Sequence, residues 1–339
     1  IMFTLSICIP TFNRCNHLAN CLNSIILNIG YNKNNVQICV SDNCSTDETE
    51  SVVRHAQKKI DIVYRKNTKN LGVTRNFLNV INMADGKYVW LIGDDDLLMP
   101  NTFERLLEII DQNNSVDFFY INSFHLTTEY VFEQHQPFDT KNLPLKMERF
   151  SEWRISGQMN FLELIDPKIS FDFLGGIFLS VFNREKWVDN IHVLNNEAIY
   201  DEKIFSHFDN TFPHIKIFAN AFSDSKAYFH AEPLSICLTG AREWAPMYPF
   251  IRSVRLIEAL DEYHKNGLPY KAYWKCKNFA LRTFVPDMVY TFVYKKESGY
   301  EYIKFFKLLF SNWLYPEFYW SSFRYAIRKF NNLFRGHNF

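Results

Sequence analysis

Residues 3–121 alternate short apolar runs with segments of helical periodicity, and this alternation limits the folds that the chain can adopt. Between the apolar runs, residues such as Leu18, Leu22 and Ile25 recur at the spacing of one helix face. Strands that alternate with helices form a mostly parallel central sheet flanked by helices. The sequence therefore predicts an α/β, Rossmann-like fold. The predicted strands cover residues 3–9, 36–40, 62–64, 88–92 and 117–121.

Polar clusters directly follow three of these strands, namely Thr11–Arg14, Asp42-Asn43 and Asp94–Asp96. The carboxyl ends of parallel strands meet at one edge of the sheet, and ligands bind beyond that edge. We therefore expect the three clusters to converge on one site. Neither GxGxxG nor GxxxxGK[ST] occurs, so the sequence does not support a Rossmann dehydrogenase or a P-loop NTPase.

Three adjacent carboxylates, Asp94–Asp96, follow Gly93 without a basic residue between them. Because like charges so close together repel one another, they need either free solvent or a cation. A hard divalent ion such as Mg2+ or Mn2+, bound together with a diphosphate, would suit this turn. The alternative is an acidic surface turn before a helix that begins near Asn101. The polar clusters at the other strand ends favour the cation site.

The composition excludes several classes of protein. A formal net charge of zero argues against a general nucleic-acid binder. The 47% of hydrophobic residues is enough for a globular core. Seven cysteines without a CxxC pair suggest buried, reduced thiols of a cytosolic protein. No apolar run reaches the roughly 18 residues of a membrane span.

Three segments carry a resemblance to a known family: LSICIPTFNR, ICVSDNCSTDET and NLGVTRNFLNVINMADGKYVWLIGDDDLL. Together they resemble the nucleotide-sugar-binding half of a family 2 glycosyltransferase with the GT-A fold. Within that family the chain is most similar to O-antigen sugar transferases of the abequosyltransferase type. This narrower resemblance rests on IPTFNR, SDN, GGIFLSVFNREKW and TFPH. The resemblance implies a nucleotide-sugar half in residues 2–122, an acceptor half in residues 123–248 and a helical C-terminal region in residues 249–339.

The resemblance also implies the donor site. The family's D-x-D turn makes Asp95 the metal ligand, with Asp94 near the ribose and Asp96 as a further ligand or a neighbour of the metal. The first aspartate of the common pattern falls at Gly93, which leaves the ribose contact and the ligand set open. The implied nucleotide-sugar contacts are Pro10, Thr11, Asn13 and Arg14 in the nucleotide pocket, Asp42 and Asn43 at the base, and Asn70 and Arg75 closing over the donor.

The second half contains the expected acceptor side. Gly175 and Gly176 permit a close backbone approach to a ligand or a tight bend. Trp187 either stacks on a sugar ring or belongs to the core. By resemblance, Arg242 follows the last strands of the catalytic core and contacts the diphosphate from a loop that Gly240 makes mobile.

An inverting transferase needs a general base that deprotonates the acceptor hydroxyl. The resemblance favours Asp209, near the TFPH segment, and the apolar periodicity does not choose between it and Asp201 or Glu202. His214 is a further candidate, although a structural histidine is the more common case.

The last segment, residues 300–339, is rich in Phe, Tyr and Trp and carries six Lys or Arg against two Glu. Basic helices with aromatic residues suit an anionic membrane surface. The alternative is a helical cap that packs on the core or on a second subunit as a homodimer.

The resemblance thus implies a metal-dependent hexosyl- or deoxyhexosyltransferase that uses Mn2+ or Mg2+. It would transfer a sugar to a glycan in O-antigen or capsule synthesis, with an acceptor linked to undecaprenyl diphosphate at the inner face of the cytoplasmic membrane. Two alternatives remain. A nucleotidyltransferase would normally begin with a Gly-rich phosphate loop, which is missing here, and a non-catalytic nucleotide-sugar-binding module would not need an intact acidic turn.

Overall fold

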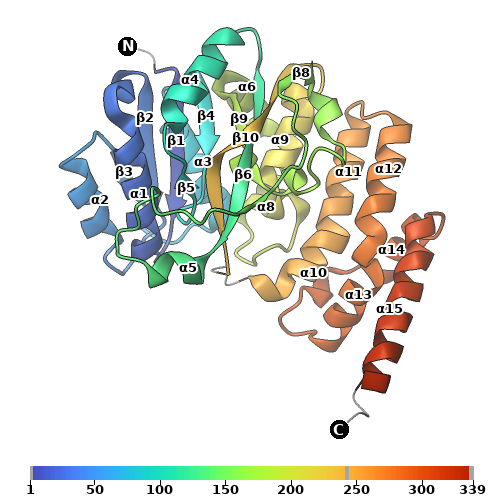
Figure 1. Cartoon of the computed structure of the whole chain (residues 1–339). Coiled ribbons are helices and arrows are strands. Elements are labelled where there is room, and N and C mark those ends of the chain that lie inside the picture. The colour runs from blue at the N-terminus through green and yellow to red at the C-terminus, as the bar shows by residue number, and fades with distance from the viewer. Residues whose placement is uncertain (1–2, 241–243, 336–339) are drawn as a thin grey trace.

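The computed structural model describes residues 3–240 and 244–335, and its core is one mixed, mostly parallel sheet (Figure 1). The strands are β1 (Leu5–Thr11), β2 (Val36–Asp42), β3 (Val63–Lys66), β4 (Tyr88–Leu91), β5 (Leu97–Leu98), β6 (Phe118–Thr127), β7 (Glu148–Arg149), β8 (Gly157–Asn160), β9 (Ser180–Asn183) and β10 (Lys226–Thr239). Their order is β3-β2-β1-β4-β9-β6-β10-β5. β3, β2, β1 and β4 run parallel, whereas β9 joins β4 to β6 in antiparallel pairing. The predicted α/β fold is confirmed.

Helices cover both faces of the sheet, as the alternation predicted. Those of the α/β part are α1 (Cys15–Ile29), α2 (Thr49–Gln57), α3 (Val73–Asn82), α4 (Thr102–Gln112), α5 (Thr128–Glu133), α6 (Arg184–Asn190), α7 (Asn196–Tyr200), α8 (Phe208–Thr211) and α9 (Pro213–Phe222). The C-terminal helices are α10 (Tyr248–Phe250), α11 (Leu256–Lys265), α12 (Tyr270–Ala280), α13 (Phe284–Val293), α14 (Phe305–Asn312) and α15 (Pro316–Arg335). Within the described residues, no helix combines the length and the apolar character needed to span a bilayer.

Side chains of the central strands alternate between two hydrophobic clusters, one on each face of the sheet. Ile7 and Ile9 of β1 belong to the cluster that includes α1 and α4. Cys8, which lies between them, belongs to the cluster that includes α3 and α9. Successive residues of a strand point to opposite faces, so a sheet with helices on both faces needs apolar residues at consecutive positions. This requirement explains the unbroken apolar runs of the sequence.

The first two strands extend into the polar clusters that were expected to follow them. β1 continues through Pro10 to Thr11, which lies opposite Asp42 of β2 in the parallel register. This strand therefore extends two residues past the end of the predicted range, residues 3–9. Because Thr11 and Asp42 are the last residues of paired strands, the sheet itself fixes their separation at the carboxyl edge.

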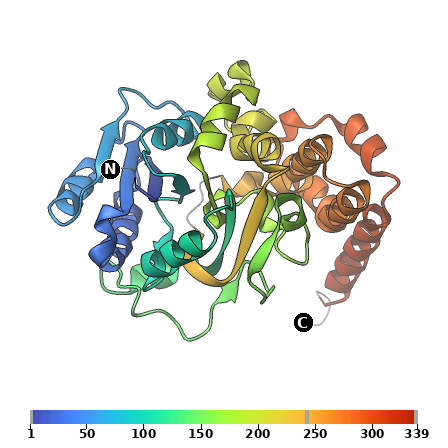
Figure 2. The same cartoon turned by 90° about the horizontal axis from the view of Figure 1, so that it is seen from above.

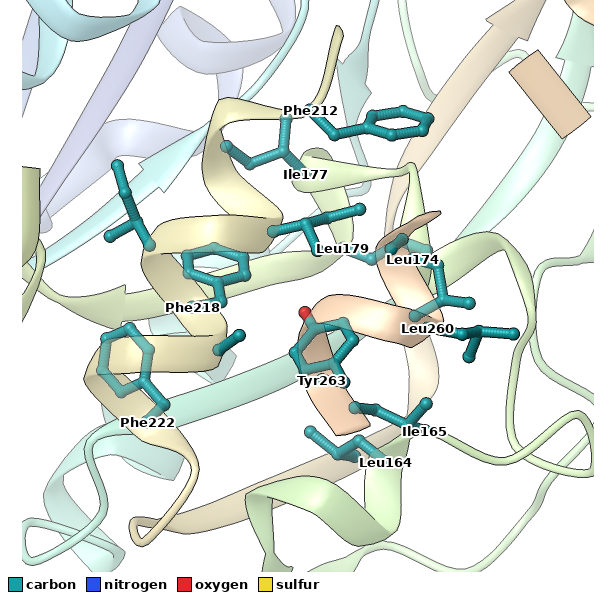
Figure 3. Packing of buried hydrophobic residues seen from close by; sticks show 14 of the residues in the cluster. Leu164, Ile165, Leu174, Ile177, Leu179, Phe212, Phe218, Phe222, Leu260 and Tyr263 are labelled. Atoms are coloured by element: carbon teal, nitrogen blue, oxygen red, sulfur yellow. The ribbon is translucent and has the colours of Figure 1, made fainter. Parts of the chain in front are cut away.

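The C-terminal helices pack beside the α/β part and share its core (Figure 2). Phe218 and Phe222 of α9 lie against Leu260 and Tyr263 of α11 in one buried cluster (Figure 3). All four side chains are almost completely inaccessible to solvent. Burial of this kind stabilises each large apolar side chain by about 1.5–3 kcal/mol. The helical region is therefore packed against α9, on one face of the sheet.

Candidate active site

The first and third predicted clusters meet at the carboxyl edge of the sheet. Nη1 of Arg14 lies 3.1 Å from Oδ1 of Asp94 and 3.1 Å from Oδ2 of Asp95. The hydroxyl of Thr11 donates a hydrogen bond of 2.8 Å to Oδ2 of Asp94. Two carboxylates from the turn after β4 thus share one cationic nitrogen that comes from the turn after β1.

Two largely buried carboxylates this close together need a positive charge beside them if both are to be ionised. Burial and the charge of Asp95 raise the pKa of Asp94 to about 6, and Arg14 and Thr11 oppose that rise only in part. Burial lowers the pKa of Arg14, but the charges of Asp94 and Asp95 raise it overall. The guanidinium and the carboxylates therefore stabilise one another's ionised forms.

The same donor set fits a divalent ion that is held partly by substrate. Mg2+ in phosphate-transfer and related sites is bound by one or two carboxylates together with phosphate oxygens and water. In residues 3–240 and 244–335, no cluster of three or more His, Cys, Asp or Glu side chains could cage a metal without such help. Asp94 and Asp95 thus offer part of a coordination shell for Mg2+ or Mn2+, which a ligand such as a diphosphate would complete.

The third carboxylate, Asp96, closes the turn. Its Oδ2 accepts a 2.7 Å hydrogen bond from the backbone N–H of Gly93, and its own N–H donates to the carbonyl of Gly93. A Cβ at position 93 would lie 2.6 Å from Oδ1 of Asp95. In this conformation the carboxylates of Asp95 and Asp96 fill the space beside Gly93, and a side chain at this position would have to displace them. Metal ligation by Asp96 stays a prediction, and one of its oxygens already has this structural task.

The second cluster is fully enclosed at Asp42, which has no exposed surface. Its Oδ1 accepts the N–H of Ser45 at 2.7 Å, and its Oδ2 accepts the hydroxyl of Tyr64 at 2.8 Å. Burial and the neighbouring Asp42 raise the pKa of Tyr64. Tyr64 was not among the predicted site residues, and no feature of its short strand indicated that its hydroxyl faces Asp42.

A network of amides connects Asn43 to the residues before α3. Nδ2 of Asn43 donates to Oδ1 of Asn70 at 2.8 Å, and Oδ1 of Asn43 accepts the N–H of Leu71 at 2.8 Å and Nδ2 of Asn67 at 3.2 Å. The predicted residues Asn43 and Asn70 are therefore in direct contact. Asn67 is an addition that the sequence did not reveal, since it lies in a loop without periodicity.

Asn13 connects the first and second clusters, although it has a left-handed backbone with φ of 52°. Its N–H donates to Oγ of Ser45, and its Oδ1 accepts the N–H of Thr46, both at 2.8 Å. Beside it lies an open pocket of about 490 Å³, whose lining includes Arg14, His17 and Phe132. The three strand-end clusters thus form one continuous polar edge next to an open pocket.

Helix α3 joins this edge to the segment before α9. The guanidinium of Arg75 lies 4.3 Å from the centre of the Tyr200 ring, and the hydroxyl of Thr74 donates to the carbonyl of Asn210 at 2.9 Å. The predicted donor residue Arg75 thus also contacts the end of α7. Consequently, α3 contacts the stretch that carries the predicted base candidates.

Of the three carboxylate candidates for the base, two already have hydrogen-bond donors. Asp209 is buried, and its Oδ2 accepts the N–H of Asn195 at 2.6 Å and Nζ of Lys216 at 2.8 Å. Asp201 accepts the N–H of Lys203 and the hydroxyl of Ser206, which lower its pKa.

Glu202 is the candidate that is exposed to solvent. The choice among the three carboxylates stays a prediction. Asp209 can act as a base only if its ion pair with Lys216 opens when the acceptor binds.

Other predicted acceptor residues turn out to be packing residues. Trp187 is fully buried and stacks on Phe182 with ring centres 4.9 Å apart, so stacking on a sugar is wrong and the core alternative is right. Burial lowers the pKa of His214 to about 3, and the ring lies between Phe212 and Phe218, which makes it a neutral core residue and not a base.

Gly175 and Gly176 allow close approach within the protein. A Cβ at Gly175 would lie 3.3 Å from the ring of Phe212, and one at Gly176 would lie 3.1 Å from the carbonyl of Asp172. The close contacts of these two glycines are thus made by protein atoms. Arg242, the predicted diphosphate contact, lies outside the described residues.

Comparison with known proteins agrees with this architecture. Residues 6–166 match a protein-family model described as Glycosyl transferase family 2. Abequosyltransferase RfbV of Salmonella typhimurium is 39% identical over 114 residues. That match covers 33% of this chain and 34% of the relative, so it spans about a third of the relative's length.

Two solved structures share the fold of nearly the whole chain. Staphylococcus aureus TarS, residues 1–349, superposes with a TM-score of 0.53 at 14% identity over 88% of this chain and 74% of that one. It has also been solved in complex with UDP and with UDP-GlcNAc. The mannosyltransferase PcManGT from Pyrobaculum calidifontis, in complex with GDP-Man and Mn2+, superposes with a TM-score of 0.50 at 13% identity, over 87% and 76% of the two chains. At these identities the likeness shows the fold, which is that of GT-A glycosyltransferases.

Proposed function

We propose that this chain, which carries a glycosyltransferase family 2 domain in residues 6–166, transfers a sugar from a nucleotide-sugar donor to a hydroxyl of a glycan. The observation that carries the proposal is the shared cation position between Asp94 and Asp95, next to Thr11 at the end of β1. A departing nucleoside diphosphate needs positive charge at this edge of the sheet, where ligands of such folds bind.

The metal proposal rests on the same two carboxylates. Asp95, with Asp94 beside it, would hold Mn2+ or Mg2+ against the diphosphate, and Asp96 would keep the turn closed. When bound, the ion neutralises the charge that develops on the leaving nucleoside diphosphate. The complex of a fold neighbour with GDP-Man and Mn2+ supports this assignment.

The nucleotide would lie across the second cluster. The amide of the exposed Asn70 and the partly exposed Tyr64 would face the base at one end of the polar edge, and Asp42 would bond the base only if its hydrogen bond to Tyr64 opens. Pro10, Asn13 and Arg14 would line the pocket between base and diphosphate. Arg75 would close over the sugar, and Arg242 stays the predicted diphosphate contact.

The acceptor hydroxyl would enter from the side of α7 and α8. A carboxylate there takes the proton while the acceptor oxygen attacks the anomeric carbon opposite the leaving group, so the reaction inverts that carbon. Asp209 remains our choice, with Asp201 and Glu202 as alternatives. The contact of Thr74 with Asn210 supports this placement, because it joins the donor half to this segment.

The acceptor would be a glycan of O-antigen or capsule type linked to undecaprenyl diphosphate, and the chain would work at the inner face of the cytoplasmic membrane. Phe306 and Phe310 of α14 and Trp313 directly after it are exposed to 74%, 75% and 53%. Lys304 and Lys307 stand next to them. Aromatic side chains mixed with lysines suit an anionic lipid surface. In Figure 1, α14 and α15 lie at the end of the molecule opposite to α2 and β3.

A thermal-shift panel tests the donor proposal. UDP-, GDP-, CDP- and dTDP-sugars are each added with and without Mn2+, and unfolding is followed by heating. Bound ligand raises the unfolding temperature with occupancy. We expect a shift with one base that requires the metal. No shift with any of these donors would contradict the proposal. A shift of equal size with and without Mn2+ would contradict the proposal that the donor is bound through a metal.

Flotation with vesicles tests the membrane proposal. The triple variant Phe306→Ser, Phe310→Ser and Trp313→Ser should lose binding to phosphatidylglycerol vesicles, whereas Tyr31→Ser, at a fully exposed site far along the chain, should keep it. Binding equal to that of the unaltered chain would contradict the proposal. A drop in mass from dimer to monomer in light scattering, without any vesicle binding, would assign the surface to a homodimer instead.

A further inference from the structure

The segment from Asp201 to Asn210 is held in a conformation that its own sequence does not favour. Phe205 has φ of 60°, in the left-handed region that residues with a Cβ rarely adopt, and its side chain is buried. Strained backbone of this kind persists only where the surroundings impose it, and it costs of the order of 1–3 kcal/mol. Some contact outside the segment must therefore hold it.

Arg255, at the end of the π-helical turn that precedes α11, provides that contact. Its side chain is only 5% exposed, and its Nη2 donates to the carbonyls of Phe205 and Ser206, both at 2.8 Å. Nη1 is bonded to Glu258 at 2.6 Å, which compensates the charge. Hydrogen bonds from an ionised donor are about twice as strong as neutral ones. A buried guanidinium thus clamps two consecutive carbonyls of the segment.

Hydrogen bonds within the segment connect Ser206, whose carbonyl Arg255 holds, to Asp201 and Asn210. The hydroxyl of Ser206 donates to Oδ2 of Asp201 at 2.7 Å, and Nδ2 of Asn210 donates to Oγ of Ser206 at 2.9 Å. The carbonyl of Asn210 in turn accepts the hydroxyl of Thr74. From Arg255 to α3, a continuous series of contacts therefore runs through the segment that carries the base candidates.

We infer that Arg255 is a positioning residue for sugar transfer, which fixes the segment 201–210 against the donor half. The inference rests on the proposed function, because it takes this segment to present the base to the acceptor. It gives the C-terminal helices a role in the active site without contact to either substrate. Arg255 itself reaches no reacting atom and acts only through the carbonyls of Phe205 and Ser206.

A simple folding role for Arg255 makes a different prediction. An arginine that only stabilises the helical region would, when removed, loosen α11 and α12 at least as much as the segment 201–210. A positioning residue loosens the segment selectively. Arg252 offers a matched control, since it lies in the same helical turn but forms its ion pair with Asp287, away from the segment.

The experiment compares Arg255→Met, Arg255→Lys and Arg252→Met in the full chain by hydrogen exchange of backbone amides. We expect Arg255→Met to speed exchange in residues 201–210 about tenfold or more, with α11 and α12 changed by less than twofold. Arg255→Lys should restore protection in part, and Arg252→Met should leave the segment unchanged. Equal acceleration in the segment and the helices, or none in the segment, would overturn the inference.

Kinetics then separate this inference from the proposed function. With the donor found by the thermal-shift panel, Arg255→Met should lower kcat about tenfold and leave the donor KM within twofold. An unchanged kcat, or a tenfold rise in donor KM, would overturn the positioning role even if exchange is faster. If the unaltered chain binds no nucleotide-sugar, the proposed function fails, whereas the exchange result still decides whether Arg255 holds the segment.

Discussion

The donor edge and the segment 201–210 both hold carboxylates in place, but they do so by different means. At the donor edge, Asp94 is bonded to Thr11, which lies 83 positions away in sequence. In the segment, Asp201 is bonded to Lys203 and Ser206, two and five positions away. The edge is thus assembled by the topology of the sheet, whereas the segment is assembled by local hydrogen bonds and one clamp from the helical region.

This difference separates two tasks within the proposed reaction. If the edge binds the donor and the segment supplies the base, changes in one region should leave the function of the other intact. Substitutions in the segment should alter turnover alone. Substitutions at the edge should alter binding of metal and donor first.

Removal of the base should give the largest effect. We expect Asp209→Asn to lower the rate of transfer by about 10²–10⁴-fold, because that is the usual contribution of a positioned general base. Donor affinity in the thermal-shift assay should stay within twofold. The rate is measured as release of nucleoside diphosphate in the presence of an extract that contains undecaprenyl-diphosphate-linked glycan.

Three further variants control for this assignment. Lys216→Met removes the ion-pair partner of Asp209 but leaves the carboxylate, so an equal loss of rate would mean that the pair is structural. Asp201→Asn and Glu202→Gln should retain most of the activity. If one of them shows the large loss instead, the base is that residue.

The donor edge is tested by Asp95→Asn, which keeps the shape of the side chain and removes its charge. We expect metal-dependent donor binding to weaken by about 100-fold, which corresponds to a loss of about 2.7 kcal/mol. Titration calorimetry with the donor and Mn2+ measures the loss. Asp117→Asn, at a half-buried ion pair with Lys186 far from the edge, is the control. Unchanged affinity in Asp95→Asn would remove Asp95 from the metal site.

How far the sequence predicted each region follows from the same difference. Parallel strands bring their carboxyl ends together whatever the details of their side chains, so the meeting of Thr11, Arg14 and Asp94 was predictable from the alternation alone. That Asp42 is closed off by Tyr64 was not predictable, because it depends on how far β3 extends.

The second half of the chain was harder to predict, since its helices are short and its contacts are set by packing. Trp187 offered a choice between a sugar and the core, and only the stacking on Phe182 decides it. Arg255 gave no signal at all, because one arginine on an amphipathic helix is usually solvated and here it is buried. The conformation of a loop that is held by a residue far away in sequence cannot be predicted from the sequence of the loop.

Substitution of Arg14 should have a smaller effect at the donor edge, and it should strengthen metal binding instead of weakening it. Its guanidinium occupies the position between Asp94 and Asp95 that a divalent ion would use, so the two compete. We expect Arg14→Gln to raise the affinity for Mn2+ about tenfold in the absence of donor, since a binding site that is open only a tenth of the time binds tenfold more weakly. Titration calorimetry with Mn2+ alone measures this change. Arg54→Gln, at an exposed pair with Glu50, should have no effect. A weaker affinity in Arg14→Gln would show that the guanidinium supports the ion.

Substitution of His214 should have the smallest effect, which is a change in how the free energy of unfolding depends on pH. Its pKa is lowered to about 3 by burial, so the unfolded chain takes up a proton near pH 6.5 that the folded chain does not. The free energy of unfolding therefore decreases as the pH falls through the unfolded pKa of about 6.5. For this one group the decrease is about 0.7 kcal/mol between pH 7 and pH 6. In urea unfolding, His214→Leu should lose less stability than the unaltered chain over this interval, whereas His55→Gln at an exposed site should lose the same amount. An identical pH dependence for His214→Leu would mean that water reaches this ring, and the acceptor side would then be more open than the packing of Phe212 and Phe218 indicates.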